Sequence, residues 1–227
     1  MKPKADQAHL DAATRVAGGA GMPSAARPKR EYSKTPERRD DILRAALAVF
    51  AASGFRNGSL RDVADRVGMS QTGLFYHFAN KNELLEAVLS RRDDEARLRV
   101  GAGDGPGGMV TGVALIRGLV DLVDYNTRQP GLVALFCVLS AEATDPEHPA
   151  HDYFIQRYGF LVEATTHALR ACAESAQLRS GVDPAESAQC LVALIDGLQV
   201  QWLLRPKQVD IAGQVRRFAQ SLLTVEL

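Results

Sequence analysis

The sequence feature that most constrains the fold is a very short connection between two predicted helices. Within Leu60–Val67, apolar residues recur at the i, i+3, i+4, i+7 spacing of one helix face. Gly68 follows, where a left-handed residue ends a helix at the least cost, and Ser70 can cap the next helix. Two short helices joined by only three residues must cross steeply. The stretch from Ser59 to Lys81 therefore predicts a helix-turn-helix.

The second of these helices, residues 71–78, is predicted to have two chemically different faces. One face is apolar, and we expect Leu74, Phe75 and Phe78 to pack there on the preceding helices. No acidic residue occurs from position 70 to 78, as expected of a DNA-binding surface, because phosphates repel carboxylates. The alternative is a pair of core helices with an aromatic cluster. The face opposite the apolar one consists of Thr72, Gly73, Tyr76 and His77.

Polar side chains around this helix predict individual DNA contacts, since the second helix of such a unit enters the major groove. Gln71 suits adenine and the Thr72 methyl group suits thymine. Tyr76 and His77 can donate to phosphates or touch bases, and Lys81 is expected to hold the DNA backbone. The predicted DNA-binding residues are Ser59, Arg61, Ser70, Gln71, Thr72, Gly73, Tyr76, His77 and Lys81.

The rest of the chain alternates helical stripes with Gly- and Pro-rich punctuation. Thr35 is a plausible N-cap, with Pro36 at the first helical position and Gly54 at the end of the first helix. We find no convincing alternating strand pattern. An apolar content of 46% is sufficient for a buried core without metals or disulfides. The sequence predicts an all-α protein with about nine helices.

Residues 1–34 mix Ala, Gly, Pro and charged residues without a period, which predicts a flexible arm. The arm carries seven basic and three acidic residues, and either follows a DNA backbone or is a solvated tail. The net charge is +4 over residues 1–90 and −4 over the remainder. This bias fits a nucleic-acid contact near the N-terminus.

Neither a secretory signal nor a membrane span is evident in the sequence. The longest unbroken apolar runs, residues 45–52 and 132–139, have eight residues each, far short of a bilayer span. Cys137, Cys172 and Cys190 lie far apart without CxxC spacing, so we expect plain apolar packing for them. These features favour a cytoplasmic protein that has no membrane association.

Many positions at fixed spacing also resemble a known family. The run from Ile42 to Leu85 is similar to the N-terminal DNA-binding domain of TetR-type transcriptional regulators. The residues that carry this resemblance are Ile42, Ala45-Ala46, Phe50, Gly54-Phe55, Leu60-Arg61-Asp62-Val63-Ala64, Gly68-Met69-Ser70, Gly73-Leu74-Phe75-Tyr76-His77-Phe78, Lys81 and Glu83-Leu84-Leu85.

The resemblance implies a division of labour along the chain. Residues 35–80 would form the helix-turn-helix domain, and residues 81–227 a helical bundle for ligand binding and dimerisation. Family members often carry a phosphate-bonding tyrosine where this chain has Phe75, so we do not count Phe75 as a hydrogen-bonding residue. Asp196-Gly197-Leu198 resembles a segment that is often found near the penultimate helix of the family.

The family also implies a homodimer and an effector pocket, for which we name candidate residues. Each of them can instead fill the core of one subunit. The candidate ligand-binding residues are Asn126, Arg128, Phe136, Tyr153, Tyr158 and Trp202. The candidate dimer-interface residues, on the last two long helices, are Val192, Ile195, Val215, Phe218 and Leu222.

The implied function is a regulator, most simply a repressor, that binds a palindromic operator and leaves it when a largely apolar small molecule binds. The helix that begins near Lys81 would connect the two domains, and its charged stretch Arg91–Glu95 would be an exposed rod. The main rival is a ligand-independent DNA-binding protein whose C-terminal domain only dimerises. We expect no cofactor, metal or enzymatic activity; a metal at His148 and His151 and a nucleotide loop at Gly101–Gly108 are weaker alternatives.

Overall fold

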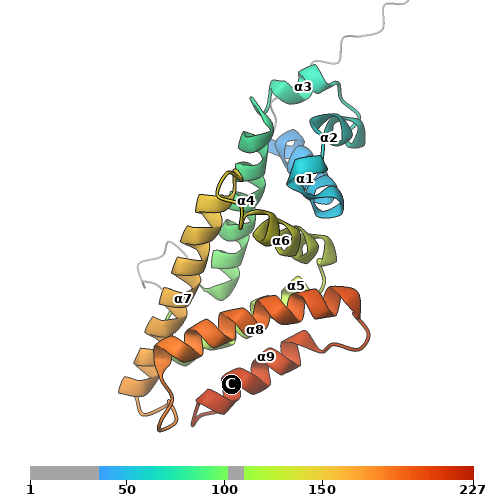
Figure 1. Cartoon of the computed structure of the whole chain (residues 1–227). Coiled ribbons are helices and arrows are strands. Elements are labelled where there is room, and N and C mark those ends of the chain that lie inside the picture. Colours follow the sequence, from blue (N-terminus) through green and yellow to red (C-terminus); the bar gives the residue numbers. More distant parts are fainter. Residues whose placement is uncertain (1–35, 102–109) are drawn as a thin grey trace, which may run out of the picture. The chain divides into compact units, whose positions relative to one another are not determined.

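The computed structural model describes residues 36–101 and 110–227 of the chain. Within these ranges the protein forms nine α-helices and no β-strand, which confirms the predicted all-α class (Figure 1). The predicted arm, residues 1–34, and most of the Gly101–Gly108 segment lie outside the described residues. The helices are α1 (Pro36–Asn57), α2 (Leu60–Arg66), α3 (Gln71–Phe75), α4 (Lys81–Val100), α5 (Gly112–Asn126), α6 (Pro130–Glu142), α7 (His151–Glu174), α8 (Pro184–Leu204) and α9 (Ile211–Leu222).

Helix α1 is broken at Gly54, where the sequence predicted its end, and continues to Asn57. Its apolar stripe, which includes Ile42, Ala46 and Phe50, is completely buried. Gly54 has φ 72° and ψ 173°, a conformation outside the helical region, and one more turn follows it as far as Asn57. The break turns the last residues of α1 toward the C-terminal part of the chain.

The helix-turn-helix is present at the predicted positions. The Ser59 hydroxyl caps α2 by accepting from the Asp62 N–H at 3.1 Å. Gly68 has φ +66°, and the Met69 N–H donates back to the Ala64 carbonyl at 3.0 Å. Ser70 caps α3 by accepting from the Gly73 N–H at 3.1 Å. The capping residues and the left-handed glycine thus fix the turn between the two helices.

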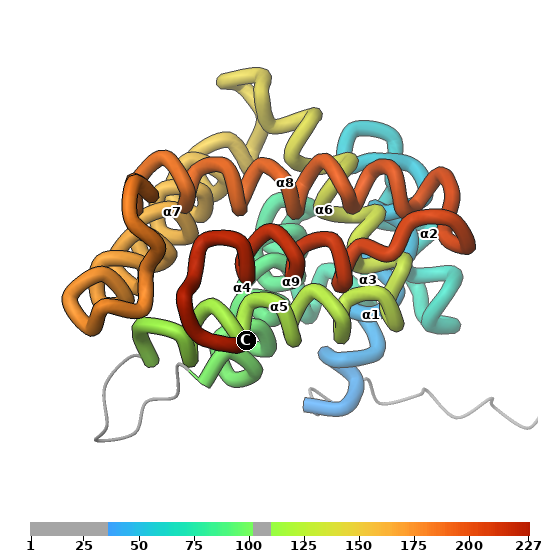
Figure 2. Tube along the Cα trace, turned by 90° about the horizontal axis from the view of Figure 1, so that it is seen from below, coloured from blue at the N-terminus to red at the C-terminus, as the bar shows by residue number. Residues whose placement is uncertain are grey.

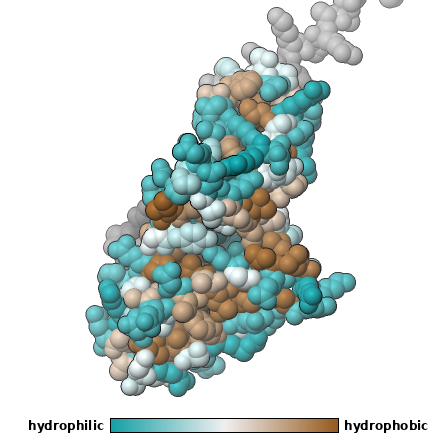
Figure 3. Space-filling model, viewed as in Figure 1, coloured by the Kyte–Doolittle hydropathy of each residue, from teal (hydrophilic) through white to brown (hydrophobic). Residues whose placement is uncertain are grey.

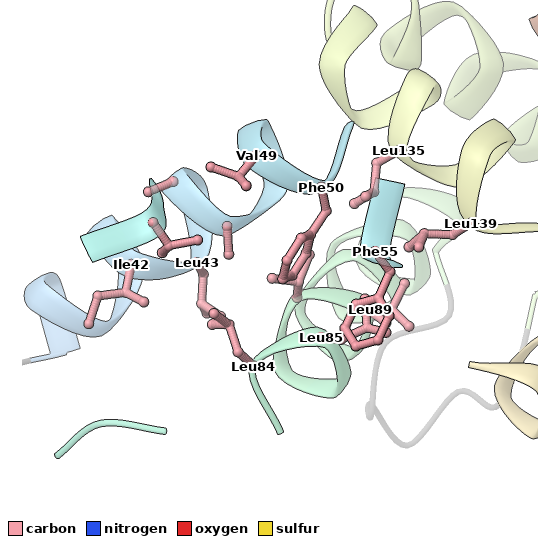
Figure 4. Packing of buried hydrophobic residues seen from close by; sticks show 14 of the residues in the cluster. Ile42, Leu43, Val49, Phe50, Phe55, Leu84, Leu85, Leu89, Leu135 and Leu139 are labelled. Atoms are coloured by element: carbon pink, nitrogen blue, oxygen red, sulfur yellow. The ribbon is translucent and has the colours of Figure 1, made fainter. Parts of the chain in front are cut away.

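One hydrophobic cluster joins the N-terminal helices α1–α4 to α6. Helix α6 is the main packing partner of α1, although the two are separated by more than 70 residues of sequence. Figure 4 shows Phe50 and Phe55 of α1 among leucines of α4 and α6, such as Leu85 and Leu139. The packing of the N-terminal helices therefore continues beyond residue 80, where the sequence predicted a domain boundary.

A second hydrophobic cluster holds α5 and α7–α9 together. Helix α9 packs between α5 and α8, and the three lie side by side in Figure 2. Val215 of α9 and Leu191 of α8 are buried in its centre. Helix α7 covers both α5 and α8, so the C-terminal half of the described chain is a layered helical bundle.

Candidate DNA interface and ligand cavity

Helix α3 presents an exposed surface with polar and aromatic side chains. Ser70, Gln71 and Thr72 are exposed, and Tyr76, directly after the helix, is 57% exposed. Phe75 is also 45% exposed, so the prediction that it packs on the preceding helices is wrong. A five-residue helix makes barely more than one turn, and Leu74 and Phe78 suffice to anchor it.

Two other residues of the predicted DNA-facing side lie elsewhere. Gly73 is buried, and its N–H is bound by the Ser70 hydroxyl, so its backbone is not offered to a DNA groove. His77 is half-buried, and its carbonyl accepts from Arg39 Nη1 at 3.3 Å. The guanidinium of Arg39 lies 4.3 Å from the centre of the Phe78 ring, which ties the first turn of α1 to the end of the recognition segment.

The flanking residues Arg61 and Lys81 differ in how accessible they are to DNA. The Arg61 side chain is 81% exposed, and its ion pair with Asp65 is long, at 3.9 Å. Arg61 is therefore available to a phosphate. Lys81 instead donates from Nζ to the Arg56 carbonyl at 3.2 Å and lies over the Phe55 ring. Burial lowers the pKa of the Lys81 ammonium, an effect that nearby Glu142 opposes. In this arrangement Lys81 binds the end of α1, and its predicted phosphate contact stays a prediction.

Glu142, the last residue of α6, binds the break in α1. Its carboxylate accepts from the Phe55 N–H at 2.8 Å. A Cβ atom on Gly54 would overlap the same carboxylate, and Gly54 already needs a positive φ. Arg56 forms an ion pair with Asp145 just beyond α6. This junction couples the end of α6 to the helix that supports the helix-turn-helix.

His148 completes the junction as a buried neutral imidazole. Its Nδ1 accepts from the Ala150 N–H at 3.1 Å, which places the ring proton on Nε2. Nε2 lies 3.5 Å from a Glu142 carboxylate oxygen. Burial lowers the pKa of His148, although Glu142 acts in the opposite direction. Within the described ranges, no group of three or more His, Cys, Asp or Glu side chains is arranged to hold a metal ion.

Two adjoining cavities lie in the C-terminal half. One, of about 140 Å³, is lined by residues of α4–α8, and the other, of about 330 Å³, lies between α4, α5 and α7. Of the predicted ligand-binding residues, Asn126, Phe136 and Tyr158 line the first cavity and Tyr153 lines the second. The residues that border both cavities are Arg92, Leu119, Leu122, Arg157, Leu161 and Thr165.

Arg128 and Trp202, also predicted to bind ligand, lie outside both cavities. The Arg128 side chain is 72% exposed and pairs with Asp124 one helical turn away. Trp202 is buried in the C-terminal cluster, where it fills the core. Helical periodicity predicts which residues belong to a helix. It does not distinguish a side chain that lines a cavity from one that fills the core, as Trp202 does, or points to solvent, as Arg128 does.

The charged groups of the cavities were not predicted from the sequence. The stretch Arg91–Glu95 was predicted to be an exposed rod, yet the side chains of Arg92 and Asp93 are only 11% and 15% exposed. Burial and the nearby Arg157 lower the pKa of Arg92 to about 10, so its guanidinium stays charged at neutral pH. Asp196 of α8 is also largely buried, which raises its pKa. The one available signal was that Asp196 directly follows an apolar run of α8, residues 190–195.

The predicted dimer-interface residues divide into three groups. Val215 and Leu222 are 0% and 8% exposed within one chain, so they belong to its core and have almost no surface for a partner. Val192 and Ile195 are half-buried and line the first cavity, and Phe218 is half-buried on α9. A different stripe of α8 is exposed and contains only uncharged residues, namely Cys190, Ala193, Gly197, Val200 and Leu204.

The fold and these sites match known regulators along most of the chain. Residues 42–88 match the family model for bacterial regulatory proteins of the tetR family. Residues 114–226 match the model for the C-terminal domain of BetI-type transcriptional repressors. The chain belongs to the TetR family of transcriptional regulators. Members of this family are DNA-binding regulators and not enzymes.

Individual relatives are similar over nearly their full length. The chain is 26% identical to the HTH-type transcriptional regulator TtgR of Pseudomonas putida over 200 residues, covering 85% of this chain and 93% of TtgR. A transcriptional regulator from Saccharomonospora viridis, solved with choline, shares the fold with a TM-score of 0.67 at 23% identity, over 84% of this chain and all of that one. SmeT of Stenotrophomonas maltophilia, solved with triclosan, has a TM-score of 0.65 at 20% identity, over 82% of this chain and 89% of SmeT.

Proposed function

We propose that this TetR-family protein is a ligand-responsive transcriptional repressor that binds a palindromic operator as a homodimer and leaves it when a small molecule binds the C-terminal cavities. The observation that carries the proposal is the exposed face of α3, which has no acidic residue and belongs to a helix-turn-helix. The choline and triclosan complexes of structural neighbours support a ligand-responsive member of the family. Such a protein works on DNA in the cytoplasm.

The proposed DNA contacts come from the exposed residues alone. Gln71 and Thr72 reach base edges, and Tyr76 and Arg61 hold the phosphate backbone. Phe75 joins this set, because an exposed aromatic ring can contact a thymine methyl group. Ser59 and Ser70 cap their helices and position this surface, as do Gly73 and His77. Residues 35–80 act as the DNA-binding part and residues 81–227 as the regulatory part.

A second copy of the chain covers the exposed stripe of α8 in our proposal. The most apolar 18-residue stretch of α8 is only 22% buried, and α8 is long and apolar enough to cross a membrane by length and composition. Figure 3 shows hydrophobic surface gathered over the C-terminal helices, whereas the helix-turn-helix end is mostly hydrophilic. An exposed apolar face of this kind marks an interface. Since α6, α7 and α9 hold the opposite side of α8, protein rather than lipid fits the open side.

Two helices are placed to couple the cavities to DNA binding. Helix α4 contributes Arg92 to the cavities and begins at Lys81, which binds the end of α1. Helix α6 contributes Phe136 and ends at Glu142, which binds the Phe55 N–H. Operator half-sites one turn apart require recognition helices separated by about 34–36 Å. A ligand that shifts either helix would change that separation and weaken DNA binding by coupling free energies of about 1–3 kcal/mol.

The DNA-binding face is tested by the substitution Tyr76→Ala, measured as operator affinity in a gel-shift assay. We expect affinity to fall at least about tenfold, since one good contact to a base or phosphate is worth this much. Leu98→Ala is the matched control, because Leu98 is also an exposed large side chain, on α4. Equal operator affinity of Tyr76→Ala and wild type, with both dimeric, would contradict the assignment of this face.

The dimer is tested by Val200→Asp, measured by light scattering after size-exclusion chromatography. A charge in the centre of a buried apolar interface is expected to produce monomers that bind the operator weakly. Ile155→Asp places the same charge on an exposed apolar position of α7 and should leave the dimer intact. A dimer that survives Val200→Asp would place the interface elsewhere.

Ligand response separates the proposal from a purely architectural DNA-binding protein. Small molecules that raise the melting temperature of the protein are tested for release of a labelled operator by fluorescence anisotropy. A filled core would bind none of them, whereas the cavities of about 140 and 330 Å³ should accept some. If molecules bind in the cavities and operator affinity does not change, the architectural alternative holds.

A further inference from the structure

Four charged side chains converge where the two cavities meet. Arg92 and Asp93 come from α4, Arg157 from α7 and Asp196 from α8. Both arginines line both cavities, while Asp93 lines the larger and Asp196 the smaller one. The side chains of Arg92, Asp93 and Arg157 are 11%, 15% and 14% exposed, so they lie in a largely desolvated setting. Charges in such a setting select strongly for a ligand of complementary charge.

The two arginines share one carboxylate. Arg92 Nη1 donates to Asp93 Oδ1 at 3.1 Å, and Arg157 Nη1 donates to the same oxygen. The other oxygen of Asp93 accepts from the Tyr153 hydroxyl at 2.8 Å. One negative charge therefore serves two guanidinium groups, each of which has several N–H donors in a planar fork. Donor capacity and one positive charge are left over at the cavity wall.

Asp196 does not supply the missing negative charge at close range. Among the ion pairs within 4.0 Å in the described part of the chain, none joins Asp196 to Arg92 or Arg157. Its hydrogen-bond partner is Tyr158, and burial raises the pKa of the Asp196 carboxyl, although Tyr158, Arg157 and Arg92 act in the opposite direction. Asp196 thus binds Tyr158 and leaves the N–H donors of both arginines without a direct partner on α8.

The aromatic ring at this point already faces cations of the protein itself. The guanidinium groups of Arg92 and Arg157 lie 4.5 and 4.9 Å from the centre of the Phe136 ring. A quaternary ammonium ligand, such as the choline in the S. viridis structure, would normally be recognised by aromatic faces. Here it would compete with two arginines for the ring and be repelled by both. An anion would instead meet their free donors.

We propose that the effector is an anionic amphipathic small molecule whose carboxylate, or an oxyanion of similar shape, binds Arg92 and Arg157. Its apolar body would lie along Leu119, Leu122 and Leu161, which border both cavities. The planar fork of arginine matches a carboxylate in two parallel hydrogen bonds. This inference rests on the proposed ligand-responsive function and adds the chemical class of the ligand.

Calorimetry on the full-length protein, without DNA, tests the inference with matched probes. The rigid set is 2-naphthoate, its primary amide and 2-naphthylmethylamine, the flexible set is decanoate, decanamide and decylamine, and choline is added. We expect each acid to bind about tenfold more tightly than its amide, as one hydrogen-bonded charge pair would give. The amines and choline should bind more weakly than the amides.

Substitutions then assign the preference to the arginines. Arg157→Gln should reduce the difference between acid and amide to less than about threefold. Arg128→Gln, an exposed arginine outside both cavities, should leave it unchanged. Asp93→Asn frees the guanidinium groups and should tighten acid binding, an effect that damage to the fold would not produce. If Arg157→Gln unfolds, Arg157→Lys keeps the charge without the fork and should retain only part of the preference.

The inference is overturned if amides, amines or choline bind as tightly as the acids, if the acid preference survives Arg157→Gln, or if neither acid binds. Operator release is measured separately by anisotropy. An acid preference without release would leave this inference standing and contradict the ligand-responsive function. Release of the operator by neutral probes, without any acid preference, would support the ligand-responsive function and contradict this inference.

Discussion

The two hydrophobic clusters of this protein differ in how completely they are filled. Around the helix-turn-helix, Phe50, Leu74 and Phe78 are at most 1% exposed and belong to one hydrophobic cluster. In the C-terminal half, two cavities lie among helices α4–α8, and charged groups such as Arg92 line them. The filled cluster can hold a recognition surface rigidly, whereas the hollow one can change shape when a ligand enters.

Helix α6 belongs to both regions. Leu135 and Leu139 are completely buried against the N-terminal helices, while Phe136 and Ser140 line the smaller cavity. In the proposed mechanism, a change at the cavity side of α6 would reach α1 through the contact of Glu142 with the Phe55 N–H.

The largest effect is expected from a cavity created in the filled region. Phe50→Ala should destabilise the protein by about 3–5 kcal/mol, because Phe50 is completely buried and its neighbours cannot collapse onto the space. Leu122→Ala, at the wall of the existing cavities, should cost about 1 kcal/mol, since this leucine is only partly buried. Urea denaturation followed by circular dichroism measures both. Similar losses for the two variants would show that the clusters are packed alike.

The next effect concerns the link between the regions. Gly54→Ala should cost about 2–3 kcal/mol, because alanine is strained at a positive φ and its Cβ would displace the Glu142 carboxylate. Gly181→Ala is the matched control, with φ +81° and open space around the position, and should cost about 1–2 kcal/mol. Gly54→Ala should also weaken the effect of any bound ligand on operator affinity. Equal losses of stability for the two substitutions would show that the overlap with Glu142 contributes nothing.

The smallest effect is a pH dependence that arises at the same junction. The pKa of His148 is lower in the folded than in the unfolded state, so the unfolded state binds more protons as the pH falls through 6.5. Stability at the junction is therefore fully present above that pH and is lost toward the lower folded pKa. His148→Gln should make the melting temperature less sensitive to pH between about 7 and 5. His167→Gln, an exposed histidine, should leave the pH profile unchanged.

Local sequence signals were sufficient for the helix-turn-helix. Ser59, Gly68 and Ser70 each act within three or four residues, so the caps and the turn could be predicted from their spacing. The exposure of Phe75 and the burial of Gly73 could not, because α3 is too short for a helical wheel to define its faces. The sequence thus predicted which segment faces DNA, whereas the structure decided which of its residues are exposed.

The sequence by itself determined the helical class, the caps and breaks, and the family, because these depend on the chemistry of neighbouring residues. Only the tertiary structure decided that Arg92, Arg157 and Asp196 meet at one cavity, that Val215 is core, and that Gly197 and Val200 are exposed. These residues lie on different helices or different faces of one helix. Their burial depends on how helices distant in sequence pack, which helical periodicity alone does not specify.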